Sequence, residues 1–516
     1  MFWVDETINE ILNRADEKYL VTDYKTPSGK IHIGALRGVI IHDVISRGLI
    51  EKSKQAEFWY GFDDFDPIDG LSDDLKNDYG KFMGMPLCNV QSPDKDKNFA
   101  QYYAKSFIDV INLLGINVKI IWASEIYKNG THNKAIEIVL NNADKIRQIY
   151  KDVSGGEKPN DWYPLHVVCP KCGKIGTTKV TGWDGKEVEF ECLENLVQWA
   201  KGCGEIGKMS PFDGNAKMPY KVETAAKWFA FNTSVELAGK DHYTKGGTFY
   251  VARAVADQVF KIKPAYGYGY EWFLVGGKKM STSRGTGASV EEIAAILRPE
   301  ILRFLMVRTR AKRSIEFDVE GDTISLLYDE YDRCSAAYLE DPDSDLGRAY
   351  YYSEIDPTKK PAEYLMRFSK VAFFLQMPHV DILSEAEKEK GAPLSSSEKQ
   401  EIQNRTQEAT LWLKKYAPEE AKFSICEKLP DSVKEFTNEQ KVYLEAVLKK
   451  LKELDNWDGK AIHTVLHEVK NEQKLPPKDA FSAIYRIFID KDSGPQAGWF
   501  LAALDKKFVI NRLEEV

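Results

Sequence analysis

The chain has 516 residues, of which 43% are hydrophobic and 29% charged, a composition typical of a globular protein and unlike that of a disordered or collagen-like chain. With 71 Lys and Arg against 79 Asp and Glu the formal net charge is −8, so any nucleic-acid binding must come from local basic patches. No apolar run approaches the ~18 residues of a membrane span, the first residues have no pattern of a secretory signal, and there are only seven cysteines. We therefore expect a cytoplasmic protein of about three domains, without membrane contact or a disulfide framework.

The first segments alternate between strand-like and helix-like patterns. Residues 6–17 have the spacing of an amphipathic helix, 18–24 and 56–67 have the pattern of buried strands, and 35–52 repeats apolar residues at helical spacing. A third strand is predicted at 117–124. This order predicts a βαβ unit and a parallel sheet, and therefore an α/β domain of the Rossmann type.

The middle of the chain changes character at residues 150–220, which are rich in Gly, Lys and Cys and predict an inserted module of short β pieces. Strand and helix patterns alternate again up to residue 277. After about residue 290 amphipathic helical patterns dominate, such as 291–310 and 438–454, and predict an all-α C-terminal domain. The polar stretch 383–400 predicts a surface loop or linker.

These patterns divide the chain into four parts. Residues 1–149 and 221–290 are the two halves of the Rossmann-type domain, 150–220 is the Cys-rich insert between them, and 291–516 is the helical C-terminal domain.

Two glycine-edged loops carry the strongest local signal, TPSGKIHIG (26–34) and GGKKMSTSRGTG (276–287). Each follows a predicted strand, and open α/β sheets bind ligands at the carboxyl ends of their strands. Gly29 and Gly34 let the backbone approach a nucleotide closely, and the N-terminus of the helix that follows attracts phosphate.

One basic side chain in each loop is a candidate catalytic residue. His32 is placed to donate a hydrogen bond to a phosphate oxygen, and Lys279 to neutralise charge that develops on an α-phosphate. Taken alone, each loop also fits a plainer interpretation, a Gly/Pro turn with a surface histidine and an exposed Lys-rich loop. Their order and separation along the chain favour the functional interpretation.

Four cysteines in the predicted insert form a candidate metal site. Cys169 and Cys172 have CxxC spacing, and Cys192 and Cys203 follow. Four thiolates suit tetrahedral Zn²⁺ in a structural role. The second pair is spaced more widely than a tight knuckle, so four unrelated thiols remain an alternative, and His166 is a spare ligand if Cys192 does not reach the site.

Local basic clusters and aromatic residues indicate where RNA would bind. Residues 308–313 and 201–208 are positive patches that would make phosphate contacts salt-sensitive, although solvated helix ends would have the same composition. In the C-terminal third, stacking on unpaired bases is one use for Trp457 and Trp499. The apolar surroundings of Trp499 favour core packing for that residue.

The two loops also carry a family resemblance. His32-Ile33-Gly34 and KMSTS (279–283) resemble the HIGH and KMSKS signatures of class I aminoacyl-tRNA synthetases. Over nearly the whole chain, further segments resemble the class I lysyl-tRNA synthetases: FDDFDP (62–67), AGKDH (238–242), YEW (270–272), LRPEILRFLMVRTR (297–310), YDEYDR (328–333) and SGPQAGWFLAAL (493–504).

This resemblance implies that the protein joins L-lysine to ATP, accompanied by Mg²⁺, and then transfers the lysyl group to the terminal ribose of lysine tRNA. His32 and Lys279 would be the catalytic residues. The insert would contact the acceptor end of the tRNA, the helical domain its stem and anticodon, and we expect a monomer. The implied ATP-binding residues are Gly29, Gly34, Lys279, Met280, Ser281 and Ser283.

Recognition of lysine requires a carboxylate or polar cage for the ε-ammonium and an apolar wall for the carbon stem. By resemblance, Thr26, Trp228, His242 and Tyr270 are lysine-binding residues, and Asp63 is a candidate carboxylate for the ammonium. Structural roles remain open for three of them, because Trp228 suits a core position, His242 a turn cap, and Asp63 the end of a strand.

Two positions depart from the family pattern. The family usually has Asn after His-x-Gly and an acid three residues later, where this chain has Ala35 and Gly38. Ala35 cannot donate to phosphate, and Gly38 removes a carboxylate that could contact lysine. These departures motivate one alternative, a catalytically inactive tRNA-binding paralogue. A second alternative is a class I synthetase for another amino acid such as glutamate, although the sequence offers acids where a glutamate enzyme would need a basic pocket.

Overall fold

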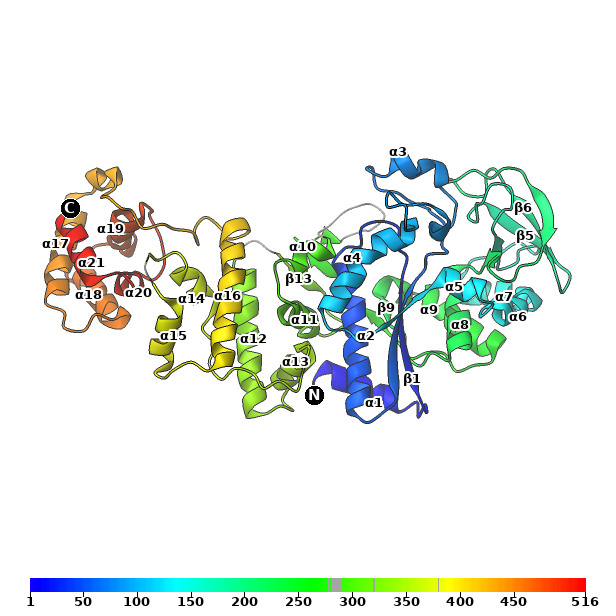
Figure 1. The fold of residues 1–516 in the computed structure, drawn as a ribbon, viewed down its shortest axis with the longest axis horizontal. Helices are drawn as coiled ribbons and strands as arrows, with labels where there is room; N and C mark the ends of the chain where they lie inside the picture. The colour runs from blue at the N-terminus through cyan, green and yellow to red at the C-terminus, as the bar shows by residue number, and fades with distance from the viewer. Residues whose placement is uncertain (277, 280–288, 319–320, 379) are drawn as a thin grey trace. The chain divides into compact units, whose positions relative to one another are not determined.

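The computed structural model describes residues 1–516 apart from 277, 280–288, 319–320 and 379, and at 278–279 it describes only the backbone. The chain forms two compact units (Figure 1). The first contains Met1–Phe317 and Glu340–Thr358, and the second contains Asp318–Leu339 and Lys359–Val516. Within the described residues, no helix combines the length and apolar character needed to cross a membrane.

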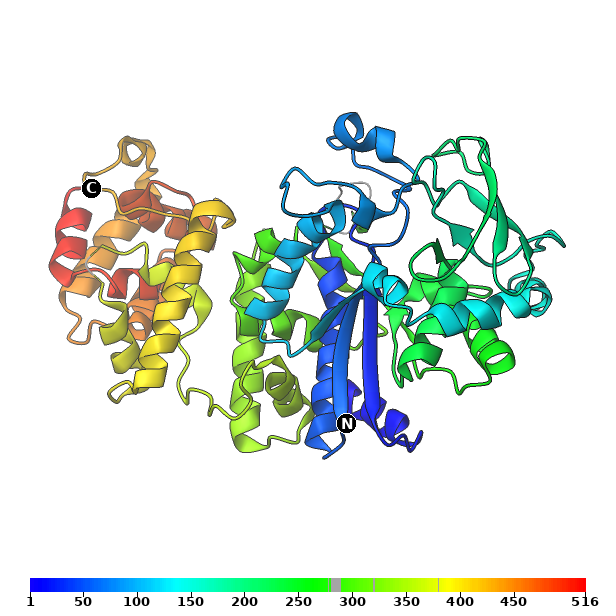
Figure 2. The same cartoon turned by 45° about the vertical axis from the view of Figure 1, so that its right-hand side comes forward.

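A parallel sheet lies at the centre of the first unit. Strand β1 (Tyr19–Lys25) pairs in parallel with β2 (Ala56–Phe62), which pairs in parallel with β3 (Lys119–Trp122). Helix α2 (Gly34–Glu51) connects β1 to β2 and lies beside the strands in Figure 2. These elements confirm the predicted βαβ unit, although the first helix, α1 (Trp3–Leu12), begins and ends earlier than expected.

The sheet continues on the other side of β1 with segments from much later in the chain. Val235 bridges Val21 on one side and Tyr266 on the other, both in parallel. The short strands β9 (Ala238–Gly239) and β10 (Gly269–Tyr270) extend this pairing. The sheet therefore runs in the order β3, β2, β1, the segment of Val235 and β9, and the segment of Tyr266 and β10. This is the Rossmann-type arrangement, in which the strand order reverses beside β1.

Buried charge fixes α2 against its neighbours. Arg303, on α11 (Pro299–Val307), is fully buried and donates to Asp43 of α2 at 2.7 Å and to the carbonyl of Ser353 at 3.1 Å. The guanidinium thereby satisfies several buried oxygens at once, as a buried charge requires. The other helices of this unit are α3 (Lys76–Tyr79), α4 (Phe99–Leu113), α5 (Ala123–Lys128), α6 (Asn133–Asn141), α7 (Ala143–Ser154), α8 (Tyr220–Phe231), α9 (Thr248–Val255), α10 (Val290–Ala294) and α13 (Asp345–Ser353).

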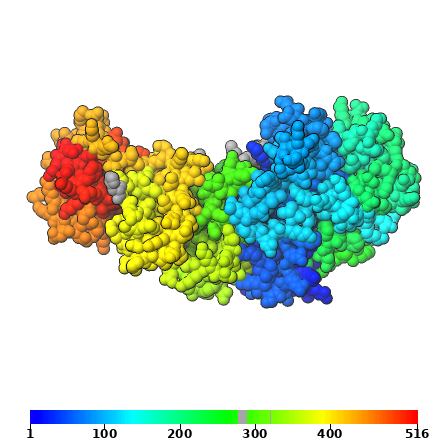
Figure 3. Space-filling view, viewed as in Figure 1, coloured from blue at the N-terminus to red at the C-terminus, as the bar shows by residue number. Residues whose placement is uncertain are grey.

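A small antiparallel module interrupts the parallel sheet, as the composition of residues 150–220 predicts. It contains a three-stranded and a two-stranded sheet. The amides of Ile175 and Gly176 both donate to the carbonyl of Gly84, at 2.7 and 3.0 Å, and join the module to the segment after β2 (Figure 3). Its strands are β4 (His166–Val167), β5 (Thr178–Trp183), β6 (Val188–Cys192), β7 (Ile206–Met209) and β8 (Ala216–Lys217).

The second unit is helical in its described residues, as predicted for the C-terminal part of the chain, although residues 291–317 and 340–358 of the predicted helical domain belong to the first unit. Fully buried Arg405 donates to Asp332 and to the carbonyl of Met366 and ties its longest helices together. Buried side chains such as Tyr443 and Phe488 form the core of its C-terminal part. The helices are α12 (Thr323–Glu340), α14 (Phe368–Phe374), α15 (Ile382–Lys390), α16 (Ser396–Lys415), α17 (Asn438–Lys452), α18 (Gly459–Glu472), α19 (Pro477–Ile489), α20 (Ala497–Ala502) and α21 (Lys506–Glu514).

Two segment predictions are wrong. The stretch 383–400 is not a loop, because Gly391 ends α15 in the left-handed conformation and the hydroxyl of Ser395 caps α16. The helical pattern at 291–310 is split between α10 and α11. Arg298 is extended because it precedes Pro299, which begins α11.

Candidate active site

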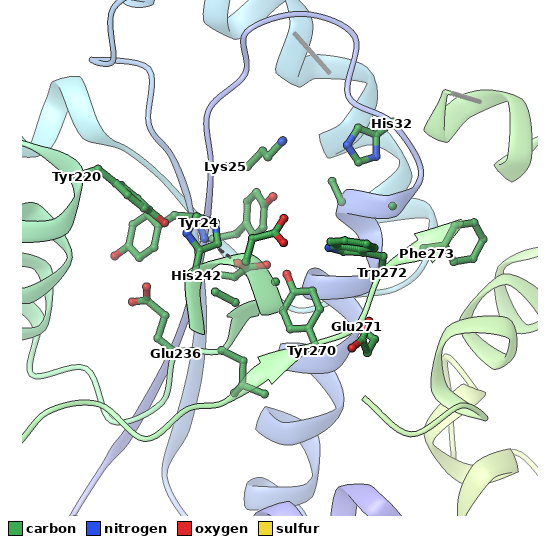
Figure 4. Close-up of a pocket in the computed structure, with 18 residues that line it drawn as sticks. Tyr24, Lys25, His32, Tyr220, Glu236, His242, Tyr270, Glu271, Trp272 and Phe273 are labelled. Atoms are coloured by element: carbon green, nitrogen blue, oxygen red, sulfur yellow. Dashed lines mark hydrogen bonds between the residues drawn. The ribbon is translucent and has the colours of Figure 1, made fainter. Parts of the chain in front are cut away.

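A cavity of about 250 Å³ opens in the first unit at the carboxyl ends of β1 and β9, where the strand order reverses (Figure 4). Ligands of open α/β sheets bind at this position. The cavity is lined by Asp23, Tyr24, Lys25, His32, Gly34, Ala35, Tyr60, Tyr220, Glu236, Leu237, Ala238, Gly239, Asp241, His242, Tyr270, Glu271, Trp272 and Phe273.

One end of the cavity is formed by His32, Gly34 and Ala35, at the start of α2. Ile33 precedes this helix and supplies no side-chain hydrogen bond to it. The first amides of a helix carry partial positive charge and bind anions. The start of α2 is therefore suited to a phosphate group.

The described residues on both sides of the second glycine-edged loop lie close to the first loop or to the cavity. His32 forms an antiparallel bridge with Ser289, the first described residue after the second loop. On the near side of that loop, β12 (Lys278–Lys279) pairs with β11 (Phe273–Val275), whose Phe273 lines the cavity. The Lys279 side chain and the predicted ATP contacts Met280, Ser281 and Ser283 lie outside the described residues.

Two buried carboxylates occupy other parts of the wall. Burial raises the pKa of Asp23 well above its usual range, and the nearby Glu236 raises it further. Burial likewise raises the pKa of Glu236 to about 7, although its Oε2 accepts hydrogen bonds at 2.9 Å from Thr22 and from Trp228. Both carboxylates would gain from a bound cation.

Aromatic rings form much of the remaining wall. Tyr220 and His242 meet edge to face with their ring centroids 5.6 Å apart. The ammonium of Lys240 lies 4.0 Å above the ring of Trp272 and pairs with Glu271 at 2.6 Å, so the Glu271 carboxylate already has a cation. Such walls suit the carbon stem of an amphipathic ligand.

Of the five residues predicted to bind lysine, two line the cavity and three do not. His242 and Tyr270 line the cavity. Trp228 is only 1% exposed and instead orients Glu236 through its indole N–H. Thr26 donates to Asp66 at 2.7 Å and faces a second cavity next to the insert, while Asp63 pairs with Lys227.

Asp63 belongs to a buried network of charges under the first loop. The ammonium of Lys227 lies 2.5 Å from Asp63 and 3.8 Å from Glu223. Lys217, from the insert, lies 2.5 Å from Glu223 and 3.0 Å from Asp66. Burial alone would raise the pKa of Glu223, but the two ammonium groups lower it to about 2. This network joins the end of β2, α8 and the insert.

The four cysteines of the insert lie together. The sulfur atoms of Cys169, Cys172, Cys192 and Cys203 all lie within 4.8 Å of one another, with 3.6 Å between Cys169 and Cys203 and 3.7 Å between Cys172 and Cys192. Sulfur ligands about 2.3 Å from a tetrahedral zinc ion are roughly 3.8 Å apart. The donor set therefore fits such an ion, and the spare ligand His166 is not needed.

In the two basic segments predicted to contact RNA, at least one side chain of each forms an ion pair within the protein. In the basic segment 308–313, Arg310 is exposed but pairs with Glu6 at 2.7 Å. In 201–208, Lys208 pairs with Asp184 at 2.6 Å. The expectation that Trp499 packs in the core is wrong, because its side chain is 44% exposed.

Asp23, Glu236 and Tyr220 are cavity residues that the sequence analysis did not select. Asp23 lies inside a strand whose pattern indicated only burial, and Glu236 stands in the apolar stretch SVELAG. An ionisable residue in a buried strand was the available signal, since such residues are rarely buried without a partner.

Comparison with known proteins gives a family for both parts of the chain. Residues 1–356 match the family described as tRNA synthetases class I (K), and residues 370–516 match an anticodon binding domain. The chain is 32% identical over 534 residues to a lysine–tRNA ligase of Methanosarcina barkeri, covering 99% of this chain and 97% of that protein. It is 31% identical over 521 residues to a lysine–tRNA ligase of Thermoplasma acidophilum, covering 100% and 99%. The chain therefore belongs to the class I tRNA synthetase family.

Proposed function

We propose that this protein is a lysine–tRNA ligase that activates lysine with ATP and transfers it to lysine tRNA. The observation that carries the proposal is the cavity at the sheet's reversal point, with a helix start that has no side-chain cap at one end and buried carboxylates elsewhere in its wall. Such a site accommodates a phosphate and an ammonium group together. The names of the relatives support the same activity.

The chemistry requires positioning and charge stabilisation more than proton transfer. A carboxylate oxygen of lysine attacks the α-phosphorus of ATP, the bond to pyrophosphate breaks, and lysyl-adenylate forms. A ribose hydroxyl of the tRNA then attacks the acyl carbon, and AMP leaves. His32 and the start of α2 would contact the phosphates, and Lys279 would stabilise negative charge on the α-phosphate. Mg²⁺ would accompany ATP as its counter-ion.

The same cavity argues against glutamate as the substrate. A glutamate side chain would add a carboxylate to a wall in which burial already raises the pKa of Asp23 and Glu236, so a further negative charge there would be costly. Burial lowers the pKa of Lys25, the ammonium in the same wall, and this weakens it as a partner for glutamate. The inactive-paralogue alternative rests on Ala35 and Gly38 alone.

We assign the binding of tRNA to the other parts of the chain. The region 370–516 would bind the anticodon, and the insert at 150–220 would contact the acceptor end. A monomer acting in the cytoplasm, where translation takes place, remains our expectation.

Lysine-dependent exchange of labelled pyrophosphate into ATP tests the proposal. With Mg²⁺, and with tRNA present in a parallel assay in case tRNA is required, we expect exchange that saturates with lysine and not with glutamate. A protein that binds tRNA but shows neither exchange nor charging would be the inactive paralogue.

We further propose that the four cysteines hold a structural Zn²⁺. Replacing Cys172 by serine should lower the zinc content from about one ion per chain to nearly none and loosen the insert, because four thiolates form the site. Metal analysis after purification without chelators measures this, with Cys426→Ser as the matched control. Equal zinc in the Cys172 variant and the wild type would contradict the assignment.

A further inference from the structure

The space beside Gly38 on α2 is already filled. A Cβ atom at this position would lie 2.5 Å from the hydroxyl of Tyr270 and 2.7 Å from Oδ2 of Asp23. Gly38 therefore leaves room for the carboxylate of Asp23, which approaches from β1. An acidic group thus lies beside α2, although α2 has no acid at position 38.

This carboxylate has few partners. Oδ1 of Asp23 accepts a hydrogen bond from the amide of Tyr24 at 2.9 Å. Among the described residues, the one basic side chain within ion-pair distance is His42, whose Nδ1 lies 3.6 Å from Oδ2. Asp23 is nevertheless 7% exposed and lines the cavity.

His42 cannot supply the missing charge. Its Nε2 accepts a hydrogen bond from the amide of Leu237 at 2.9 Å, so the ring proton sits on Nδ1 and is donated to the carbonyl of Gly38 at 2.7 Å. Burial also lowers the pKa of His42 to about 4. In the part of the chain that the structure describes, a neutral, fully engaged imidazole leaves the Asp23 carboxylate without a charged partner at ion-pair distance. Burial raises the pKa of Asp23, and this outweighs the opposite effect of the Lys25 ammonium, which lies in the same cavity wall but outside that distance.

Asp23 is a better cation site than the other buried carboxylate of the cavity. Glu236 already accepts hydrogen bonds from Thr22 and Trp228 on one oxygen. The residue beside Asp23, Gly38, lies four residues along α2 from Gly34, which is about 6 Å along the helix axis. In Figure 4, His32 lies at the upper end of the cavity and Tyr270 lies lower. The distance from Gly34 to Gly38 along α2 therefore matches an extended lysine, with its ε-ammonium at Asp23 and its carboxylate near the start of α2, where phosphate is expected to bind.

We propose that Asp23 binds the ε-ammonium of the lysine substrate and is the residue that selects lysine over uncharged amino acids of similar shape. This assignment rests on the proposed function. The hydroxyl of Tyr270, on the same side of Gly38, borders the ammonium site, and His42 positions α2 and the segment at Leu237 around it.

The substitution Asp23→Asn tests the proposal, with norleucine, which lacks the ε-ammonium, as the probe. In lysine-dependent pyrophosphate exchange we expect the KM for lysine to rise about 100-fold, while kcat falls by less than about 10-fold. Inhibition by norleucine should stay within about 3-fold of wild type. A merely structural role would weaken both ligands equally.

Asp64→Asn is the matched control. Asp64 is a buried aspartate after β2 whose oxygens accept from the amide and hydroxyl of Ser124, and it does not line the cavity. This variant should leave the ratio of lysine to norleucine affinity unchanged. The melting temperature of ligand-free Asp23→Asn should equal or exceed that of wild type, because burial of the Asp23 carboxylate is unfavourable, as its raised pKa shows.

Two results would overturn the proposal while lysine activation stands. One is an unchanged lysine KM in Asp23→Asn. The other is an equal loss of lysine and norleucine binding, which would place the α-ammonium at Asp23 or make the residue structural. Absence of lysine-dependent exchange in the wild type would instead reject the proposed function itself.

Discussion

Replacing His32 by alanine should lower the rate of lysine adenylation by about two to three orders of magnitude, the usual effect of removing one donor to charge that develops in a transition state. His32 lines the cavity at the start of α2, and its backbone is bridged to Ser289. Lys279→Ala should have an effect of similar size, because its ammonium would act on the same α-phosphate. Single-turnover formation of lysyl-adenylate measures both.

Binding of tRNA supplies the control for these two variants. The dissociation constant for tRNA should stay within about 3-fold of wild type in both variants. Neither His32 nor Lys279 belongs to the regions of the protein that we propose bind tRNA. If both variants adenylate lysine within about 3-fold of the wild-type rate, ATP binds elsewhere and the two loops are ordinary turns.

The largest effect on stability is expected from Lys227→Met. Lys227 is 2% exposed, and its ammonium lies 2.5 Å from the buried carboxylate of Asp63. Removing one partner of a buried ion pair typically costs about 3–5 kcal/mol, since the other charge stays buried without compensation. Urea unfolding, followed by a spectroscopic probe of the first unit, measures the change in the free energy of unfolding.

Two companion variants separate the ion pair from general damage to α8. Lys221→Met lies on the same helix, but its ammonium contacts only the carbonyl of Gly246 among its described hydrogen bonds, so we expect a loss below about 1 kcal/mol. The double variant Lys227→Met with Asp63→Asn should recover part of the loss. If the single and double variants were equally unstable, the stability of α8 would depend on packing around Lys227 and not on charge.

Most of the fold could be predicted because its signals are local. The apolar runs at β1 and β2 and the helical period of α2 each lie within one short window. The error at 383–400 came from treating polarity as a sign of a loop, although Ser395 and Glu398 spell a capping box and Gly391 a helix end. Pro299, inside 291–310, likewise indicated that a new helix begins there.

The candidate site was less predictable, because it depends on which strands become neighbours. His32, His242 and Tyr270 stood in recognisable motifs, and all line the cavity. The contact of Asp23 with the space at Gly38 depends on β1 lying beside α2 and on the segments of β9 and β10 following β1 in the sheet, which no local pattern reveals. Tertiary pairing also gives Asp63 its partner in Lys227, far away in the sequence.

The amino acid that this protein attaches to tRNA is measured by charging purified tRNA with each amino acid in turn. With ATP and Mg²⁺, the wild-type protein is expected to form lysyl-tRNA on lysine tRNA. It should attach neither glutamate nor any amino acid with a neutral side chain to tRNA. Formation of any other aminoacyl-tRNA in preference to lysyl-tRNA, or none at all from protein that binds tRNA, would contradict this expectation.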